Sequence, residues 1–299
     1  FTSAVALAEV DPVKYGCYVD SMVMAVEQYY DDGRMPAGYQ AYPVRMGKVD
    51  RYYDDNGLVG LAYVAAYGVT RNPAHLEKAK QVMTFILSGW RPDHDGAVSW
   101  LEGVENQKPG CANGKAMLLA LNLYGATGDP YYLTAGRRFY DWMDAYLHDP
   151  ELDIVWNSWL TQPEARLDKA VYSYNTGLLL QGAVALYGYT GDRVYLDNAR
   201  RLAEGARKFY LPETPDGAAA NRDLPWFWCC CGATRRFTTS TAIRNTWIYS
   251  SAGWIGRAGT HGMPPGCFTT TGRGRKTNRP RPSGCWTRPA SPNISSVRL

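Results

Sequence analysis

The chain has 299 residues, of which 45% are hydrophobic, and its 32 basic and 28 acidic side chains give a formal net charge of +4. The net positive charge comes from the end of the chain, because residues 229–299 hold 11 Lys and Arg and no Asp or Glu. Residues 1–228 alone have a net charge of −7. The overall sign therefore does not indicate a nucleic-acid-binding protein. No apolar run of about 18 residues predicts a membrane span, and the first residues lack the pattern of a secretion signal.

The first part of the chain leads to a pair of adjacent acids. Residues 18–30 are predicted as an outer helix, and residues 36–43 as a loop. Asp54 and Asp55 then follow two tyrosines and precede an apolar run that predicts a buried helix with its stop at Gly68. Acids at the start of a helix can simply complement its dipole, and that alternative stays open at this point.

The pattern that begins at this pair occurs three times. Residues 54–68 align without gaps with residues 111–125 and with residues 174–188, at offsets of 57 and 63. Each copy is followed by a helix start signal and a charged, amphipathic segment, so we predict three hairpins of one buried and one amphipathic helix. Hairpins repeated at this period form arrays, and a closed ring covers every apolar inner helix. The fold class is therefore predicted as all-α, an (α/α) barrel or toroid, with an open solenoid as the alternative.

In such a ring the starts of the inner helices meet at one mouth. The places of Asp54 and Asp55 are not acidic in the second copy, and in the third they are taken by Tyr174 and Asn175. A purely structural requirement would repeat the same residues in all three copies. The acid pair therefore predicts a functional site.

Three segments carry a resemblance to a known family. RYYDDNGLVGLAY, CANGKAMLLALNLYGATGDPYYL and YSYNTGLLLQGAVALYGYTGD resemble glycoside hydrolase family 76, the α-1,6-mannanases, over about residues 18–228. The resemblance implies an (α/α)6 barrel that hydrolyses α-1,6-mannosidic linkages in mannan with retention of configuration, without a cofactor. It implies Asp54 as the nucleophile and Asp55 as the general acid/base. It also implies a monomer in an extracytoplasmic location, with mannan or manno-oligosaccharides as its partners.

The chemistry explains why two neighbouring acids suit this reaction. A retaining glycosidase needs a nucleophilic carboxylate and a proton donor about 5 Å apart. Neighbouring side chains on a helix point about 100° apart, so one pair can bracket an anomeric carbon. Two close carboxylates also separate their pKa values, which keeps one of the pair protonated.

Two long connections, residues 88–110 and 150–174, supply aromatic and polar side chains for sugar binding. We expect Trp100 to stack on a mannose face and Glu102 to accept sugar hydroxyls, although a Trp packed over a helix end is an equal alternative. His94 has no converging partners, so no metal site is expected. The predicted substrate-binding residues are Tyr53, Asn56, Trp100, Glu102, Asn113, Tyr174 and Asn175.

The end of the chain has a different character. Residues 229–299 contain five of the seven cysteines, at spacings that fit neither a zinc site nor a disulfide framework. Shifting the reading frame within the freedom of the genetic code yields a plausible helical hairpin. We therefore predict a barrel domain over residues 1–228 and an aberrant, frameshifted tail over residues 229–299 that impairs activity, with low-complexity disorder as the alternative.

Two other functions stay open at this stage. One is a different carbohydrate-active toroid enzyme, such as an unsaturated glucuronyl hydrolase or a sugar epimerase, which would need a His or Arg at the mouth. The other is a catalytically inactive glycan-binding protein.

Overall fold

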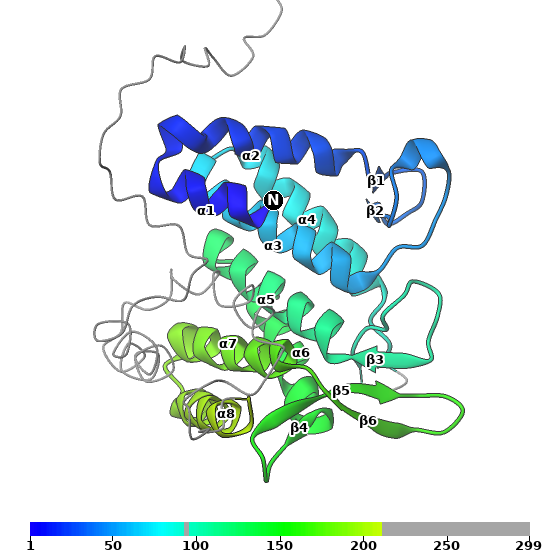
Figure 1. Ribbon diagram of the computed structural model, residues 1–299, viewed down its shortest axis with the longest axis vertical. Coiled ribbons are helices and arrows are strands. Elements are labelled where there is room, and N and C mark those ends of the chain that lie inside the picture. Colours follow the sequence, from blue (N-terminus) through cyan, green and yellow to red (C-terminus); the bar gives the residue numbers. More distant parts are fainter. Residues whose placement is uncertain (93–95, 211–299) are drawn as a thin grey trace, which may run out of the picture.

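A computed structural model describes residues 1–92 and 96–210. In this part of the chain the polypeptide forms consecutive antiparallel helical hairpins that stack side by side (Figure 1). The helices are α1 (Thr2–Val10), α2 (Pro12–Glu27), α3 (Tyr53–Thr70), α4 (Pro73–Ser88), α5 (Gly110–Thr127), α6 (Pro130–Tyr146), α7 (Ser173–Thr190) and α8 (Arg193–Tyr210).

The three predicted hairpins are confirmed as α3–α4, α5–α6 and α7–α8. Each inner helix packs on its own partner, and neighbouring inner helices in the described part of the chain pack on each other, so α3 contacts α5 and α5 contacts α7. On α5, Ala116, Leu119 and Leu123 are fully buried. Burial on several sides explains why the inner helices are apolar all round, whereas the outer helices keep one charged face.

The same turn joins the helices of each predicted hairpin. In the first, Thr70 Oγ1 donates to the carbonyl of Ala66 (2.8 Å) and accepts from the Asn72 N–H (3.2 Å). Asn72 Oδ1 in turn accepts from the Ala74 N–H (3.0 Å), which caps α4. The Asn72 side chain therefore satisfies a free donor of the next helix, and Pro73 supplies its first residue. The other two hairpins repeat these contacts at Thr127 and Asp129 and at Thr190 and Asp192.

The prediction that Gly68 stops the first inner helix is wrong, because α3 continues to Thr70. Each inner helix ends at a residue in the left-handed conformation three positions after that glycine: Arg71 (φ 57°), Gly128 (φ 72°) and Gly191 (φ 71°). The N–H of each of these residues bonds to the tyrosine carbonyl four positions before it, at 2.7–2.8 Å. This left-handed cap, rather than the earlier glycine, ends the helix.

The N-terminal segment forms a further hairpin. The predicted outer helix at residues 18–30 is α2, which begins earlier, at Pro12, with the side chain of Asp11 accepting from the Lys14 N–H (3.0 Å). It is preceded by α1, which packs against α3 and adds a helix that the sequence analysis did not predict. Its nine residues are too short to give a clear helical period.

Both long connections contain strands, which an all-α prediction does not include. In Figure 1 most of the strands lie along the side of the stack where α3, α5 and α7 begin, and β4 lies beside α6. β5 pairs antiparallel with β3, β4 and β6, and β1 pairs antiparallel with β2. The strands are β1 (Tyr30–Asp31), β2 (Gly38–Tyr39), β3 (Gln107–Pro109), β4 (His148–Asp149), β5 (Ile154–Leu160) and β6 (Arg166–Val171).

Several predictions fall outside the described residues. They are those for His94, for residues 229–299 and for the domain boundary at residue 228. Within residues 1–92 and 96–210, no helix combines the length and apolar character that crossing a bilayer requires.

Candidate active site

The two predicted acids lie in the first turn of α3 and differ in their surroundings. Asp54 is largely buried, with 16% of its side chain exposed, and it faces α5. Asp55 is exposed to solvent. The N-cap residue of the helix, Tyr52, makes no side-chain hydrogen bond to the first turn, and the two carboxylates lie at the positive end of the helix dipole.

Lys115 on α5 is the partner of Asp54. Its Nζ lies 3.3 Å from Asp54 Oδ2, and only 13% of the lysine side chain is exposed. Sequence reasoning missed this residue. The available signal was that Lys115 is the single charged residue in α5, at the place that leucine holds in the other two copies of the repeat.

The environment shifts the pKa values of Asp55 and Cys111 at this site. Asp55 keeps contact with solvent, but the surrounding protein removes part of its hydration. This partial loss of hydration, and then the charge of Asp54, raise the pKa of Asp55 above its ordinary value, and the charge of Lys115 opposes them in part. Burial, together with the charge of Asp54, raises the pKa of Cys111 to about 12. Cys111 is therefore a neutral thiol beside Asp54, and Asp55 is the carboxyl that holds a proton more readily than an ordinary aspartate.

Asn56 and Asn113, both predicted to bind substrate, are fully buried and hold the segment that precedes each inner helix. Asn56 Oδ1 accepts from the Tyr39 N–H (2.7 Å), and Asn56 Nδ2 donates to the Tyr39 carbonyl (2.8 Å). Asn113 makes the same pair of bonds with Val98, at 2.8 and 3.0 Å. Thr176, at the equivalent place, accepts one such backbone bond (2.9 Å). This geometry supports a positioning role for both asparagines rather than the direct sugar contact that the sequence predicts.

Trp100 lies over the start of α3. Its ring centroid is 4.9 Å from that of Tyr52, and its carbonyl accepts from the Tyr53 N–H (2.9 Å). The side chain remains 41% exposed. Trp100 thus packs on the end of a helix, and its exposed aromatic surface lies beside Tyr52 and Tyr53, the two residues that precede the acids.

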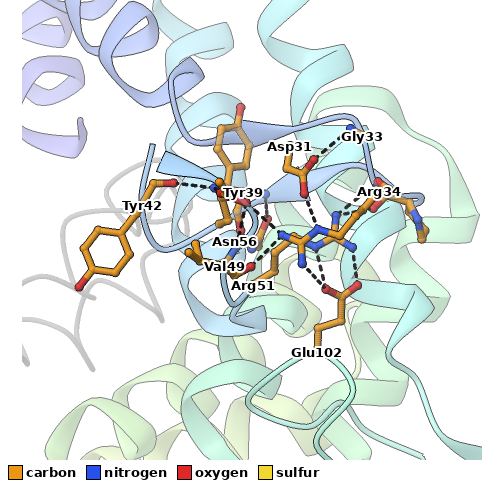
Figure 2. A network of polar contacts seen from close by, with 12 residues as sticks. Asp31, Gly33, Arg34, Tyr39, Tyr42, Val49, Arg51, Asn56 and Glu102 are labelled. Carbon is orange, nitrogen blue, oxygen red and sulfur yellow. Dashed lines mark hydrogen bonds and ion pairs between the residues drawn. The ribbon is translucent and has the colours of Figure 1, made fainter. Parts of the chain in front are cut away.

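Glu102 is paired with Arg51, in the segment that leads into α3 (Figure 2). Arg51 Nε donates to Glu102 Oε2 (2.8 Å), and Arg51 Nη2 donates to the other carboxylate oxygen. Arg51 is only 1% exposed, and its guanidinium also donates to the carbonyl of Pro36 (2.9 Å). Arg34 extends the network, with Nη1 3.8 Å from Glu102 Oε2 and a hydrogen bond to Asp31. Both oxygens of Glu102 are thus engaged in fastening the connection 88–110 to the start of α3.

The remaining predicted residues differ in their access to solvent. Tyr53 is in the core, 4% exposed, and stacks on Phe85 with ring centroids 5.1 Å apart. Tyr174 is half-buried at the start of α7 and stacks on Tyr172 at 5.5 Å. Asn175 is fully buried, and among the described residues neither polar atom of its amide has a hydrogen-bond partner.

Within residues 1–92 and 96–210, no group of three or more His, Cys, Asp or Glu side chains is arranged to hold a metal ion. A hollow of about 440 Å³ lies elsewhere, beside α6, and is lined by Trp90, Trp142 and Tyr146 among others. None of the predicted site residues lines it.

Comparisons with known proteins agree with one another. The sequence profile of "Glycosyl hydrolase family 76" matches residues 18–223, which is more than half of the chain. A mannan endo-1,6-alpha-mannosidase from Eremothecium gossypii is 28% identical over 179 residues, covering 54% of this chain and 39% of the relative. One from Candida albicans is 27% identical over 175 residues, covering 52% and 38%. The chain thus spans about two fifths of the length of these curated relatives.

Solved structures share the fold. A family 76 mannosidase from Bacteroides thetaiotaomicron is 28% identical with a TM-score of 0.71, covering 87% of this chain and 74% of that one. An α-1,6-mannanase from Salegentibacter sp. HEL1_6 was solved as an inactive variant, with two consecutive aspartates replaced by asparagine, in complex with α-1,6-mannotriose. It is 23% identical, with a TM-score of 0.62, covering 74% and 69%. A sugar epimerase from a ruminal bacterium is 15% identical with a TM-score of 0.60, covering 78% and 67%, a likeness of fold alone.

Proposed function

Because the chain belongs to glycosyl hydrolase family 76, we propose that it hydrolyses α-1,6-mannosidic linkages in mannan with retention of configuration. The observation that carries this proposal is the unequal pair at the start of α3. Asp54 is held against a lysine, and Asp55 is exposed with a raised pKa. A retaining glycosidase needs two carboxyl groups with different roles, a nucleophile and a proton donor, and the different surroundings of Asp54 and Asp55 suit these two roles.

The proposed reaction has two steps. The Asp54 carboxylate forms a bond to the anomeric carbon as the bond from that carbon to the leaving oxygen breaks, and Asp55 gives its proton to this oxygen. A water molecule then attacks the anomeric carbon and passes a proton to Asp55, while the bond to Asp54 breaks. Both carboxyl groups return to their starting states, and two inversions retain the configuration.

We propose that the exposed ring of Trp100 and the partly buried ring of Tyr174 contact the sugar. Flat apolar sugar faces stack on such rings. The amide of Asn175 lies at the place that Asp55 holds in the first copy of the repeat and has no hydrogen-bond partner among the described residues, and we propose it as a further sugar contact. The named relatives act on mannan, and on this ground we place the enzyme outside the cytoplasm.

The proposal is tested with α-1,6-mannotetraose and the full chain. We expect the parent to release products whose anomeric configuration, followed by ¹H NMR, is initially retained. Asp54→Asn and Asp55→Asn should lower kcat by about 10³-fold or more while mannotriose binding, measured by calorimetry, persists.

Two outcomes would contradict the proposal. A parent that binds mannotriose without turnover would indicate a glycan-binding protein, which was the non-enzymatic alternative from the sequence. Initial products of inverted configuration would show that Asp54 is not a nucleophile.

A further inference from the structure

Lys115, like the acid pair, differs from the residues at the equivalent places in the other two copies of the repeat. The equivalent positions in the other two copies are Leu58 and Leu178, so an inner helix of this fold needs no charge there. A lysine in an apolar helix loses hydration when its side chain is 13% exposed, and a partner of opposite charge must offset that loss. The described partner is Asp54, at 3.3 Å.

The packing of α3 on α5 keeps this lysine in place. Gly57 on α3 faces the start of the Lys115 side chain, and a Cβ at Gly57 would lie 2.8 Å from Lys115 Cβ. The absence of a side chain there lets the two helices approach closely. The lysine therefore runs along α3 toward the first turn, where its ammonium meets Asp54.

The contact is one-sided. The ammonium makes an ion pair with Asp54 Oδ2, and no such pair is formed with Asp55 in the described part of the chain. Asp54 and Asp55 act on each other. The other titratable groups that act on them are Tyr52, which precedes them in the chain, and Lys115 and Cys111 on α5. Lys115 is the cation of this set, and it lies beside the acid to which the nucleophilic role is proposed.

We propose that Lys115 is a positioning residue for the acid pair, an inference that rests on the proposed function. Its ammonium holds the Asp54 carboxylate in one orientation, and so leaves Asp55 as the acid that carries the exchangeable proton. The lysine itself does not take part in bond making. It decides which of two chemically identical neighbours attacks the sugar and which one donates the proton.

The first test compares Lys115→Met with Lys115→Arg and with Lys80→Met. Lys80 is a matched control because it forms an ion pair with Glu77 on the outer helix α4, away from the acids. We expect Lys115→Met to lower kcat on mannotetraose by about 10-fold or more with little change in KM, and to move the acidic limb of the kcat/KM profile upward by about one pH unit. Lys115→Arg should restore most of the activity, and Lys80→Met should match the parent.

A substrate with an activated leaving group identifies the acid on which Lys115 acts. An aryl α-mannoside with an acidic phenol does not need a proton donor, so Asp55→Asn should still form the glycosyl-enzyme from it. If Lys115 serves Asp54, Lys115→Met will be slow on this substrate as well as on mannotetraose. Normal cleavage of the aryl mannoside by Lys115→Met would overturn the inference, because it would show that the lysine acts on Asp55 and not on Asp54.

A measurement without turnover separates this inference from the proposed function. In protein with ¹³C-labelled aspartate carboxyls, we expect the pair to begin to protonate at a higher pH in Lys115→Met than in the parent, with Asp54→Asn and Asp55→Asn used to assign the two signals. An unchanged titration refutes the role of Lys115 even in an active enzyme. A shifted titration in a parent that hydrolyses no mannoside would instead refute the proposed function and leave the ion pair standing.

Discussion

The side chain of Asn113 offers a quantitative test of how the loops at this site are held. It is fully buried and makes three hydrogen bonds, two with the backbone of Val98 and one to the carbonyl of Pro109 (2.9 Å). Asn113→Ala leaves the Val98 N–H and carbonyl without this partner, and Val98 is itself fully buried. Since each unsatisfied buried group costs about 1–3 kcal/mol, we expect the free energy of unfolding to fall by about 3 kcal/mol.

Urea unfolding of the full chain measures this change. Asn122→Ala on the same helix is the matched control, because the Asn122 side chain donates a single bond to the carbonyl of Leu118 (2.7 Å) and is only partly buried. A loss of about 1 kcal/mol or less is expected for the control. The difference between the two variants, about 2 kcal/mol, would be a large share of the roughly 5–15 kcal/mol by which a domain is stable.

Equal stability of the two variants would refute the reasoning, since the backbone of Val98 would then not depend on Asn113. If Asn113→Ala also kept the parent's stability but lost mannotriose binding, the direct sugar contact predicted from the sequence would be correct. The positioning role assigned from the structure would then be wrong.

Two further predictions concern stability. Arg71→Gly should raise the free energy of unfolding by about 1 kcal/mol, because Arg71 is left-handed where the other copies have glycine; Gly128→Ala should lower it by a similar amount, both measured by urea unfolding. Burial raises the pKa of Glu27, but hydrogen bonds from Tyr39 and Tyr63 outweigh it, so the net pKa lies below the ordinary 4.5. The ionised Glu27 therefore contributes its full stability above pH 4.5, and this contribution is lost as the pH falls through the lowered pKa. Glu27→Gln should accordingly lose less stability than the parent on acidification. An equal loss in the two proteins would contradict this assignment.

Much of the helical framework could be predicted from local signals. The start of α4 follows from Asn72 and Pro73, because a side-chain cap and a proline act within one helical turn. The end of α3 was misplaced at Gly68, because the residue in the left-handed conformation that ends the helix is Arg71, and arginine, unlike glycine, gives no sequence signal for that conformation. The strands of the two long connections were not predicted, since β3, β5 and β6 are defined by pairing between distant segments.

The residues of the candidate site also differ in whether they could be predicted from the sequence. Asp54 and Asp55 could be found from the sequence, because the repeat shows what an inner helix requires and the pair departs from it. The hydrogen bonds of Asn56 and Asn113 to the backbone could not be foreseen, because a polar residue at the start of a helix looks the same in a sequence whether it faces solvent or binds a buried backbone segment. Lys115 was missed because its partner is 61 residues away, and α3 and α5 become neighbours only when the hairpins stack.

The order of residues alone thus determined the hairpins, the repeat and the acid pair, because helical period and capping act over a few residues. Tertiary structure decided which polar side chains reach solvent, which fasten loops, and which of the two acids receives a cation. These properties depend on the distance between separate helices, and that distance is set by side-chain packing across the stack, as at Gly57 and Lys115.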